Sequence, residues 1–174
     1  MKKVEHGKTF DRNAANPPAF EIFHNTVTEG YPEHWHTAIE IIMPTRGEYE
    51  VVVGKDSYNL KEGDIIMINS GVVHGMRFVS QGERIVMLVE PGCVENQEEM
   101  ETIFLRLPAI YFKKGDEEDP FYLFLRSQIL ELVREYDNEG AVMTHRICTG
   151  LKELFSEFGR KGFSDANAQN TFGQ

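Results

Sequence analysis

The hydrophobic period of the chain changes once, at Pro91, and this change limits the possible folds more than any other feature. Residues 19–91 contain short runs rich in Val, Ile, Tyr and Phe, separated by turn segments such as "PTRG", "KEGD" and "SQGE". The runs recur at intervals of about ten residues, which is typical of an antiparallel barrel or sandwich and argues against a parallel sheet with helical crossovers. We therefore predict a mainly β fold for this part of the chain.

The segment after Pro91 has a helical period instead. Asp119 is a good N-cap and Pro120 suits the first helical position, so the apolar stripe that follows predicts a helix over 121–137. A second amphipathic pattern predicts a helix over 141–158. A tight turn separates the two, and the order predicted is therefore a barrel followed by an antiparallel helical hairpin.

These patterns divide the chain into four parts. The parts are an N-terminal arm, a barrel, a helical subdomain and a polar tail, at residues 1–18, 19–91, 92–160 and 161–174. Within the third part, Asn96 predicts the start of a short helix because Glu99 follows at capping-box spacing. The acidic segment 107–119 is predicted to be irregular, and the tail to be either flexible or the start of a linker to a further domain.

The stretch "HWHTAIE" carries candidate metal ligands. If it is one strand, the side chains of His34, His36 and Glu40 project from the same face. Imidazole and carboxylate groups bind Zn, Fe, Ni, Cu or Mn, so the stretch predicts either a site for one divalent transition metal ion or a polar pocket without an ion. On a flat strand the Cα atoms of His36 and Glu40 lie about 13 Å apart, so sharing an ion requires the strand to curl or bulge.

Other residues are candidates for the same site. His74 follows the turn "NSG" and would enclose an ion that one strand alone cannot enclose. Arg46 and Arg77 follow the two histidine-bearing segments and are candidates to neutralise an anionic ligand. Trp35 faces away from the histidines, which predicts that it packs under the helices or at the barrel mouth. We expect no catalytic residues, because no Ser/His/Asp or Cys/His order and no phosphate-binding loop is present.

Two spaced motifs resemble a known family. The pattern H-x-H-x3-E-x6-G followed by G-x7-G-x2-H resembles the two cupin motifs, at His34, His36, Glu40 and Gly47 and then at Gly63, Gly71 and His74. The second motif departs from the usual pattern, with Asn69 in place of proline and Phe78 in place of asparagine. The resemblance implies a double-stranded β-helix (cupin or jelly-roll) barrel in which His34, His36, Glu40 and His74 bind a metal ion or an effector.

The barrel and hairpin together are similar to the N-terminal effector domain of AraC-family transcription regulators. This resemblance implies a sensor of a small-molecule effector, a homodimer formed through the helix pair, and DNA binding only through helix-turn-helix units downstream that this chain does not contain. The alternative is a stand-alone metal-dependent cupin enzyme of the oxygenase or isomerase type. The apolar residues outside the main helical stripe support the dimer, since they need a cover; they are Phe121, Leu123, Phe124 and Leu130.

Charge and composition exclude several classes of function. The net charge is −10, with 28 acidic against 18 basic residues, so direct contact with DNA is not expected. The apolar runs are too short to span a bilayer, and the first residues lack the apolar core of a signal peptide. We therefore expect a cytoplasmic protein without a membrane partner. Cys93 and Cys148 form no CxxC pair and are expected to be reduced thiols.

Overall fold

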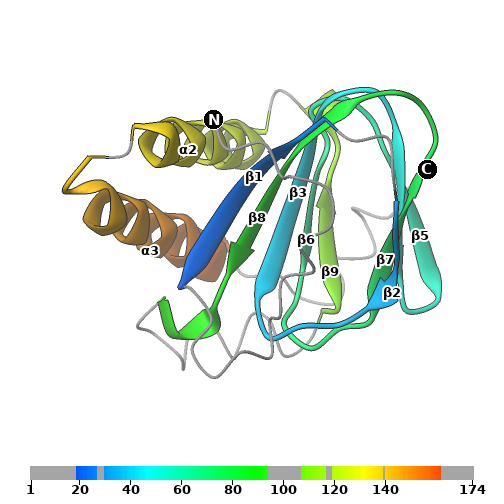
Figure 1. Cartoon of the computed structure of the whole chain (residues 1–174), viewed down its shortest axis with the longest axis horizontal. Helices are drawn as coiled ribbons and strands as arrows, with labels where there is room; N and C mark the ends of the chain where they lie inside the picture. The colour runs from blue at the N-terminus through cyan, green and yellow to red at the C-terminus, as the bar shows by residue number, and fades with distance from the viewer. Residues whose placement is uncertain (1–18, 27–29, 94–106, 117–118, 139, 162–174) are drawn as a thin grey trace.

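The computed structural model describes residues 19–26, 30–93, 107–116, 119–138 and 140–161. The N-terminal arm, the predicted helix at Asn96 and the tail after Lys161 lie outside the described residues. Within the described residues, nine strands form two antiparallel sheets and two long helices follow them (Figure 1).

The two sheets face each other as the walls of a barrel. The five-stranded sheet has the order β1 (Phe20–Asn25), β8 (Glu83–Val89), β3 (Ile39–Arg46), β6 (Ile65–Ile68) and β9 (Ala109–Phe112). The four-stranded sheet has the order β2 (Tyr31–His34), β7 (His74–Phe78), β4 (Tyr49–Val53) and β5 (Asp56–Leu60). The predicted fold, a mainly β barrel of the cupin type followed by a pair of helices, is confirmed.

The helices α2 (Pro120–Asp137) and α3 (Met143–Lys161) cover the outer face of the five-stranded sheet (Figure 1). The Asp119 side chain caps α2 by accepting a hydrogen bond from the Phe121 N–H at 2.9 Å, as predicted. A Cβ at Gly150 would lie 2.9 Å from Leu132 Cδ2, so the helices pack closely at this glycine. No helix among the described residues is long and apolar enough to cross a membrane.

Strand alternation separates a helix-side hydrophobic core from one inside the barrel. Along β3, Ile39, Ile41 and Met43 face the helices and pack with their buried stripes. Glu40 and Ile42 have the opposite parity, and Ile42 packs inside the barrel against residues of the four-stranded sheet, such as Val51. The five-stranded sheet is therefore buried on both faces, and its inner face leads to the candidate site.

The strand β9 corrects the prediction that residues 107–119 are irregular. Residues Ala109–Phe112 pair with β6, so the sheet extends past the predicted barrel boundary at residue 91. Ile110 and Phe112 contact the helix side, and Ala109 and Tyr111 contact the barrel interior. Four residues between a proline and an acidic run are too few to show a strand period in the sequence. They form a strand because they pair with the free edge of β6.

A buried carboxylate ties β9 to the start of β6. Asp64 is 6% exposed and accepts hydrogen bonds from the Tyr111 hydroxyl at 2.7 Å, the Lys114 N–H at 2.8 Å and the Lys61 N–H at 2.9 Å. Beside it, the Tyr122 hydroxyl donates to the Gly63 carbonyl at 2.8 Å, which attaches α2 to the same turn. These bonds fix the helix pair and the late strand to the barrel.

Candidate metal centre

The segment from His34 to Glu40 is not one strand, which corrects the sequence-based prediction. β2 ends at His34 in the four-stranded sheet, and β3 begins at Ile39 in the five-stranded sheet. The residues between them cross from one sheet to the other. Ala38 is fully buried in this crossing and packs against Val86 and Leu88. The crossing removes the separation that a flat strand would impose on His36 and Glu40.

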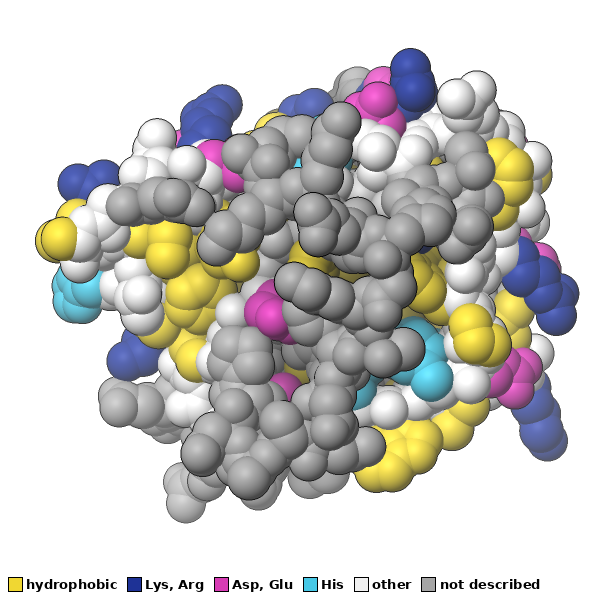
Figure 2. Space-filling view, viewed as in Figure 1, with side chains coloured by type: hydrophobic (Ala, Val, Ile, Leu, Met, Phe, Trp, Pro, Cys, Tyr) yellow, Lys and Arg dark blue, Asp and Glu magenta, His cyan; other side chains and the backbone are white. Residues whose placement is uncertain are grey.

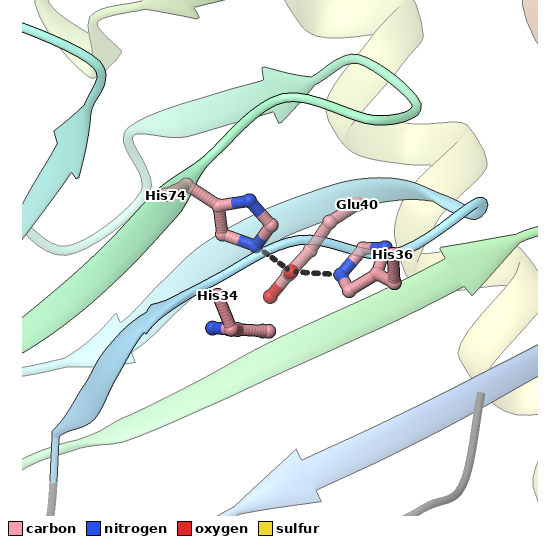
Figure 3. A group of neighbouring side chains, drawn as sticks. All are labelled: His34, His36, Glu40 and His74. Carbon is pink, nitrogen blue, oxygen red and sulfur yellow. Dashed lines mark hydrogen bonds and ion pairs between the residues drawn. The ribbon is translucent and has the colours of Figure 1, made fainter. Parts of the chain in front are cut away.

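The structure brings His34, His36, Glu40 and His74 together (Figure 3). One ligand atom from each residue lies within 4.8 Å of all the others. The Glu40 Oε2 atom is 2.8 Å from His74 Nε2 and 3.0 Å from His36 Nε2. His36, Glu40 and His74 are buried, whereas His34 is exposed. The four side chains thus form one cluster with a single solvent-facing member.

Backbone carbonyls fix the orientation of all three imidazole rings. The Nδ1 atoms of His34, His36 and His74 lie 2.8–2.9 Å from the carbonyl oxygens of Pro32, Ala38 and Val72. Because a carbonyl only accepts, each Nδ1 carries the hydrogen and each Nε2 is directed away from its own backbone. Metal-binding histidines are commonly held this way, with the other ring N–H bonded to an oxygen.

The two buried histidines have an acceptor at both ring nitrogens, a carbonyl at Nδ1 and the Glu40 carboxylate at Nε2. A neutral imidazole has one N–H and satisfies only one acceptor. Burial raises the pKa of Glu40, but the hydrogen bonds from His36 and His74 outweigh it and lower the pKa to about 2. Burial lowers the pKa of His74, but the hydrogen bond and charge of Glu40 raise it above the usual value. This arrangement favours a positive charge in the cluster, which a bound metal ion or a protonated His74 would supply.

The donor set fits a divalent transition metal ion. Two ligand atoms at adjacent positions on an ion with bonds of about 2.1 Å lie about 3 Å apart. The observed contacts of Glu40 Oε2 with the two Nε2 atoms already have this spacing. Three imidazoles and one carboxylate suit Zn, Fe, Ni, Cu or Mn, and a bound ion would supply a Lewis acid for a ligand donor atom. The chain's own contribution is to orient the imidazoles and hold Glu40 ionised.

Access to the cluster is from the side of His34. Histidine side chains reach the surface over the region of β2 and β7 and are flanked there by apolar groups (Figure 2). Trp35 is 59% exposed, and Val73, next to His74, is 46% exposed. The prediction that Trp35 packs under the helices is therefore wrong, since Trp35 lies on the crossing segment rather than in a buried strand.

The two candidate arginines lie outside the cluster. The side chain of Arg46 is 60% exposed and pairs with Glu83 at 3.2 Å. The side chain of Arg77 is 70% exposed and pairs with Glu50 at 3.3 Å. Sequence reasoning missed the three orienting carbonyls, because a backbone acceptor has no sequence signature.

We expect proton competition to control metal affinity. Metal binding requires neutral imidazoles, so affinity should fall as the pH drops through the raised pKa of His74, by about tenfold per pH unit for each proton displaced. Glu40 stays ionised throughout this range. The free energy of unfolding of the metal-free protein has the opposite pH dependence. The raised pKa of His74 stabilises the folded state at low pH, and this contribution is lost as the pH rises. Zinc titration calorimetry between pH 5.5 and 8 tests this, and a pH-independent affinity would contradict it.

Comparisons with known proteins concern the fold of the chain. The cupin domain family matches residues 25–90, a span that contains all four cluster residues. No curated protein sequence matches the chain. Among solved structures, the chain is similar to apo ToxT K231A from Vibrio cholerae strain SCE256, with a TM-score of 0.54 and 12% identity over 84% of this chain. The match spans 58% of the ToxT chain, and at this identity it shows a shared fold alone.

Two further structures match smaller parts. A cupin-2 domain protein from Shewanella frigidimarina NCIMB 400 has a TM-score of 0.39 and 16% identity, over 44% of this chain and 76% of its own. Oxalate decarboxylase from Bacillus subtilis, a protein with Mn(II) centres, has a TM-score of 0.35 and 19% identity, over 40% of this chain and 20% of its own. These two scores are too low to support an argument about function.

Proposed function

We propose that this chain, whose residues 25–90 carry a cupin domain, is the effector-sensing and dimerising part of an AraC-type transcription regulator. The observation that carries the proposal is the extent of the likeness to ToxT, an AraC-family regulator, because 84% of this chain is more than the barrel alone occupies. DNA binding would then belong to another domain, and the protein would act in the cytoplasm.

The metal centre would form part of the sensor site. His34, His36, Glu40 and His74 would hold one divalent ion, and its exposed side near Trp35 would receive a donor atom of the effector. A thermal-shift screen of small organic acids, with zinc-loaded and chelator-treated protein, tests this. The proposal requires at least one compound that raises the Tm of the zinc-loaded protein. NMR spectra recorded after hours of incubation should show that the protein has not converted this compound chemically.

The alternative is a metal-dependent cupin enzyme. The observation that favours it is the cluster itself, because a three-histidine and one-carboxylate set with a solvent-facing side leaves room for a substrate. The same NMR experiment separates the two functions. Conversion of the stabilising compound by loaded protein, and not by chelator-treated protein, would support the enzyme and overturn the sensor proposal.

The chain on its own should have no sequence-specific affinity for DNA. Its net charge of −10 opposes the phosphate contacts that dominate such binding. We expect repeated selection from a pool of random duplexes at 150 mM salt to enrich no motif. Enrichment of one motif, confirmed by tight binding in fluorescence anisotropy, would contradict this prediction.

A two-fold dimer through the helix pair is the third element of the proposal. Phe121 and Leu130 pack partly against the core of their own subunit, but Leu123 is 49% exposed on α2. We expect Leu123→Glu to weaken self-association by at least tenfold in analytical ultracentrifugation, because the change places a charge in an apolar contact. Asn59→Glu, at an exposed position of β5 in the four-stranded sheet, serves as the control for added charge. A monomeric unmodified chain at tens of micromolar would end the dimer proposal.

A further inference from the structure

The two cysteines of the chain meet in the folded structure. Cys93 lies in the short 3-10 helix η1 (Pro91–Cys93) directly after β8, and Cys148 lies in α3. They are 55 residues apart in sequence, yet their Sγ atoms are 3.5 Å apart. Both side chains are partly exposed, so small reagents in solution have access to the pair.

The two sulfur atoms lie close enough for a disulfide to form by a small movement. An S–S bond of about 2.05 Å requires them to approach by about 1.5 Å, a distance that side-chain rotation can supply. Burial, with the hydrogen bond and charge of the Cys148 thiol, raises the pKa of Cys93 to about 11, while the ammonium group of Lys152 acts in the opposite direction. The high pKa keeps the Cys93 thiol protonated and slow to react, so it persists in reduced form until an oxidant is present.

We propose that Cys93 and Cys148 form a reversible disulfide on exposure to a peroxide, and that this bond fastens α3 to the end of β8. In the first step, one thiol loses its proton to solvent and the thiolate attacks a peroxide oxygen. The O–O bond breaks, the sulfur becomes a sulfenic acid, and the hydroxide that leaves takes up a proton to give water. In the second step, the other thiol attacks the sulfenic sulfur, the S–S bond forms and a second water leaves with the thiol proton. Two thiols and one hydrogen peroxide thus give one disulfide and two waters.

The bond would add a covalent cross-link between the barrel and α3, which pack against each other through the helix-side hydrophobic core. Cys93 packs against the helix-side core, and Ile147, beside Cys148, is fully buried in it. A cross-link that closes so long a loop should raise the Tm by about 5–10 °C. This inference does not depend on the proposed sensor function, although α3 belongs to the helix pair assigned to dimerisation.

The test is mild oxidation of the purified, fully reduced chain with hydrogen peroxide. We expect free thiols measured in denaturant to fall from two to none, the intact mass to fall by about 2 Da, and peptide mapping to recover one Cys93–Cys148 cross-link. Dithiothreitol should restore both thiols and the lower Tm. The proposal is overturned if both thiols persist, if they end as sulfinic acids, or if only cross-links between chains form.

Matched variants test whether disulfide formation depends on the closeness of the two thiols or only on their reactivity. Cys93→Ser and Cys148→Ser each retain one thiol and should show no rise in Tm on oxidation. The double change Cys148→Ala with Thr149→Cys keeps two thiols but moves one to an exposed position on α3. This variant should form the intrachain cross-link at least tenfold more slowly than the unmodified chain, and an equal rate would overturn the proposal.

Discussion

Replacing His74 with alanine is expected to lower metal affinity by at least 100-fold. The change removes one of three oriented imidazoles and one of the two histidine contacts of the Glu40 carboxylate, so the ion would lose a ligand and part of the geometry that selects it. Glu40→Gln should have an effect of similar size, because it removes the one negative charge that faces the ion. Glutamine has nearly the same shape as glutamate, so a loss of metal affinity in this variant cannot be assigned to a cavity.

The fluorescence of the single tryptophan provides a direct measurement of metal binding. Trp35 is the single tryptophan and lies between His34 and His36 in the sequence, so Cu²⁺ in the cluster should quench its fluorescence. Zinc calorimetry supplies an independent dissociation constant. His145→Ala, an exposed histidine on α3, is the control and should bind like the unmodified chain. Unchanged affinity in both His74→Ala and Glu40→Gln, with the fold intact by circular dichroism, would show that the metal ion binds elsewhere and that the cluster is a polar pocket without an ion.

Asp64→Ala should lower the free energy of unfolding by about 3–5 kcal/mol, because two backbone N–H groups and a tyrosine hydroxyl lose a buried charged acceptor. Burial, together with the hydrogen bond and charge of Asp64, raises the pKa of Tyr111, so this hydroxyl stays protonated and able to donate. Urea denaturation measures the change, and a fall in Tm of about 10 °C should accompany it.

The matched control for this prediction is Asp56→Ala in the edge strand β5. Asp56 is exposed, so the same substitution there should change stability by about 0.5 kcal/mol or less. Both variants keep all four cluster residues and should bind zinc as the unmodified chain does. Equal stability of the two variants would show that Asp64 does not fasten β9 and the helix pair to the barrel.

Local patterns were sufficient for most of the fold. Short β-rich runs and their turns predicted the antiparallel barrel, because each run needs only an alternating face and a turn residue to be recognised. Asp119 and Pro120 predicted the start of α2 for the same reason, since a helix cap is a contact between near neighbours. The strand β9 escaped prediction, because its four residues become a strand only by pairing with β6.

The sequence by itself determined which groups are available, a set of three histidines and one glutamate in two spaced motifs and two thiols without a motif. Tertiary structure decided which of them meet. The crossing between β2 and β3 brings His36 to Glu40, the pairing of β2 with β7 brings His34 to His74, and the packing of α3 on the sheet brings Cys148 to Cys93. Arg46 and Arg77 instead lie at the surface, where they pair with Glu83 and Glu50. The physical reason is that periodicity encodes the face on which a side chain lies, whereas a contact between distant residues depends on strand order and on where the chain changes sheets.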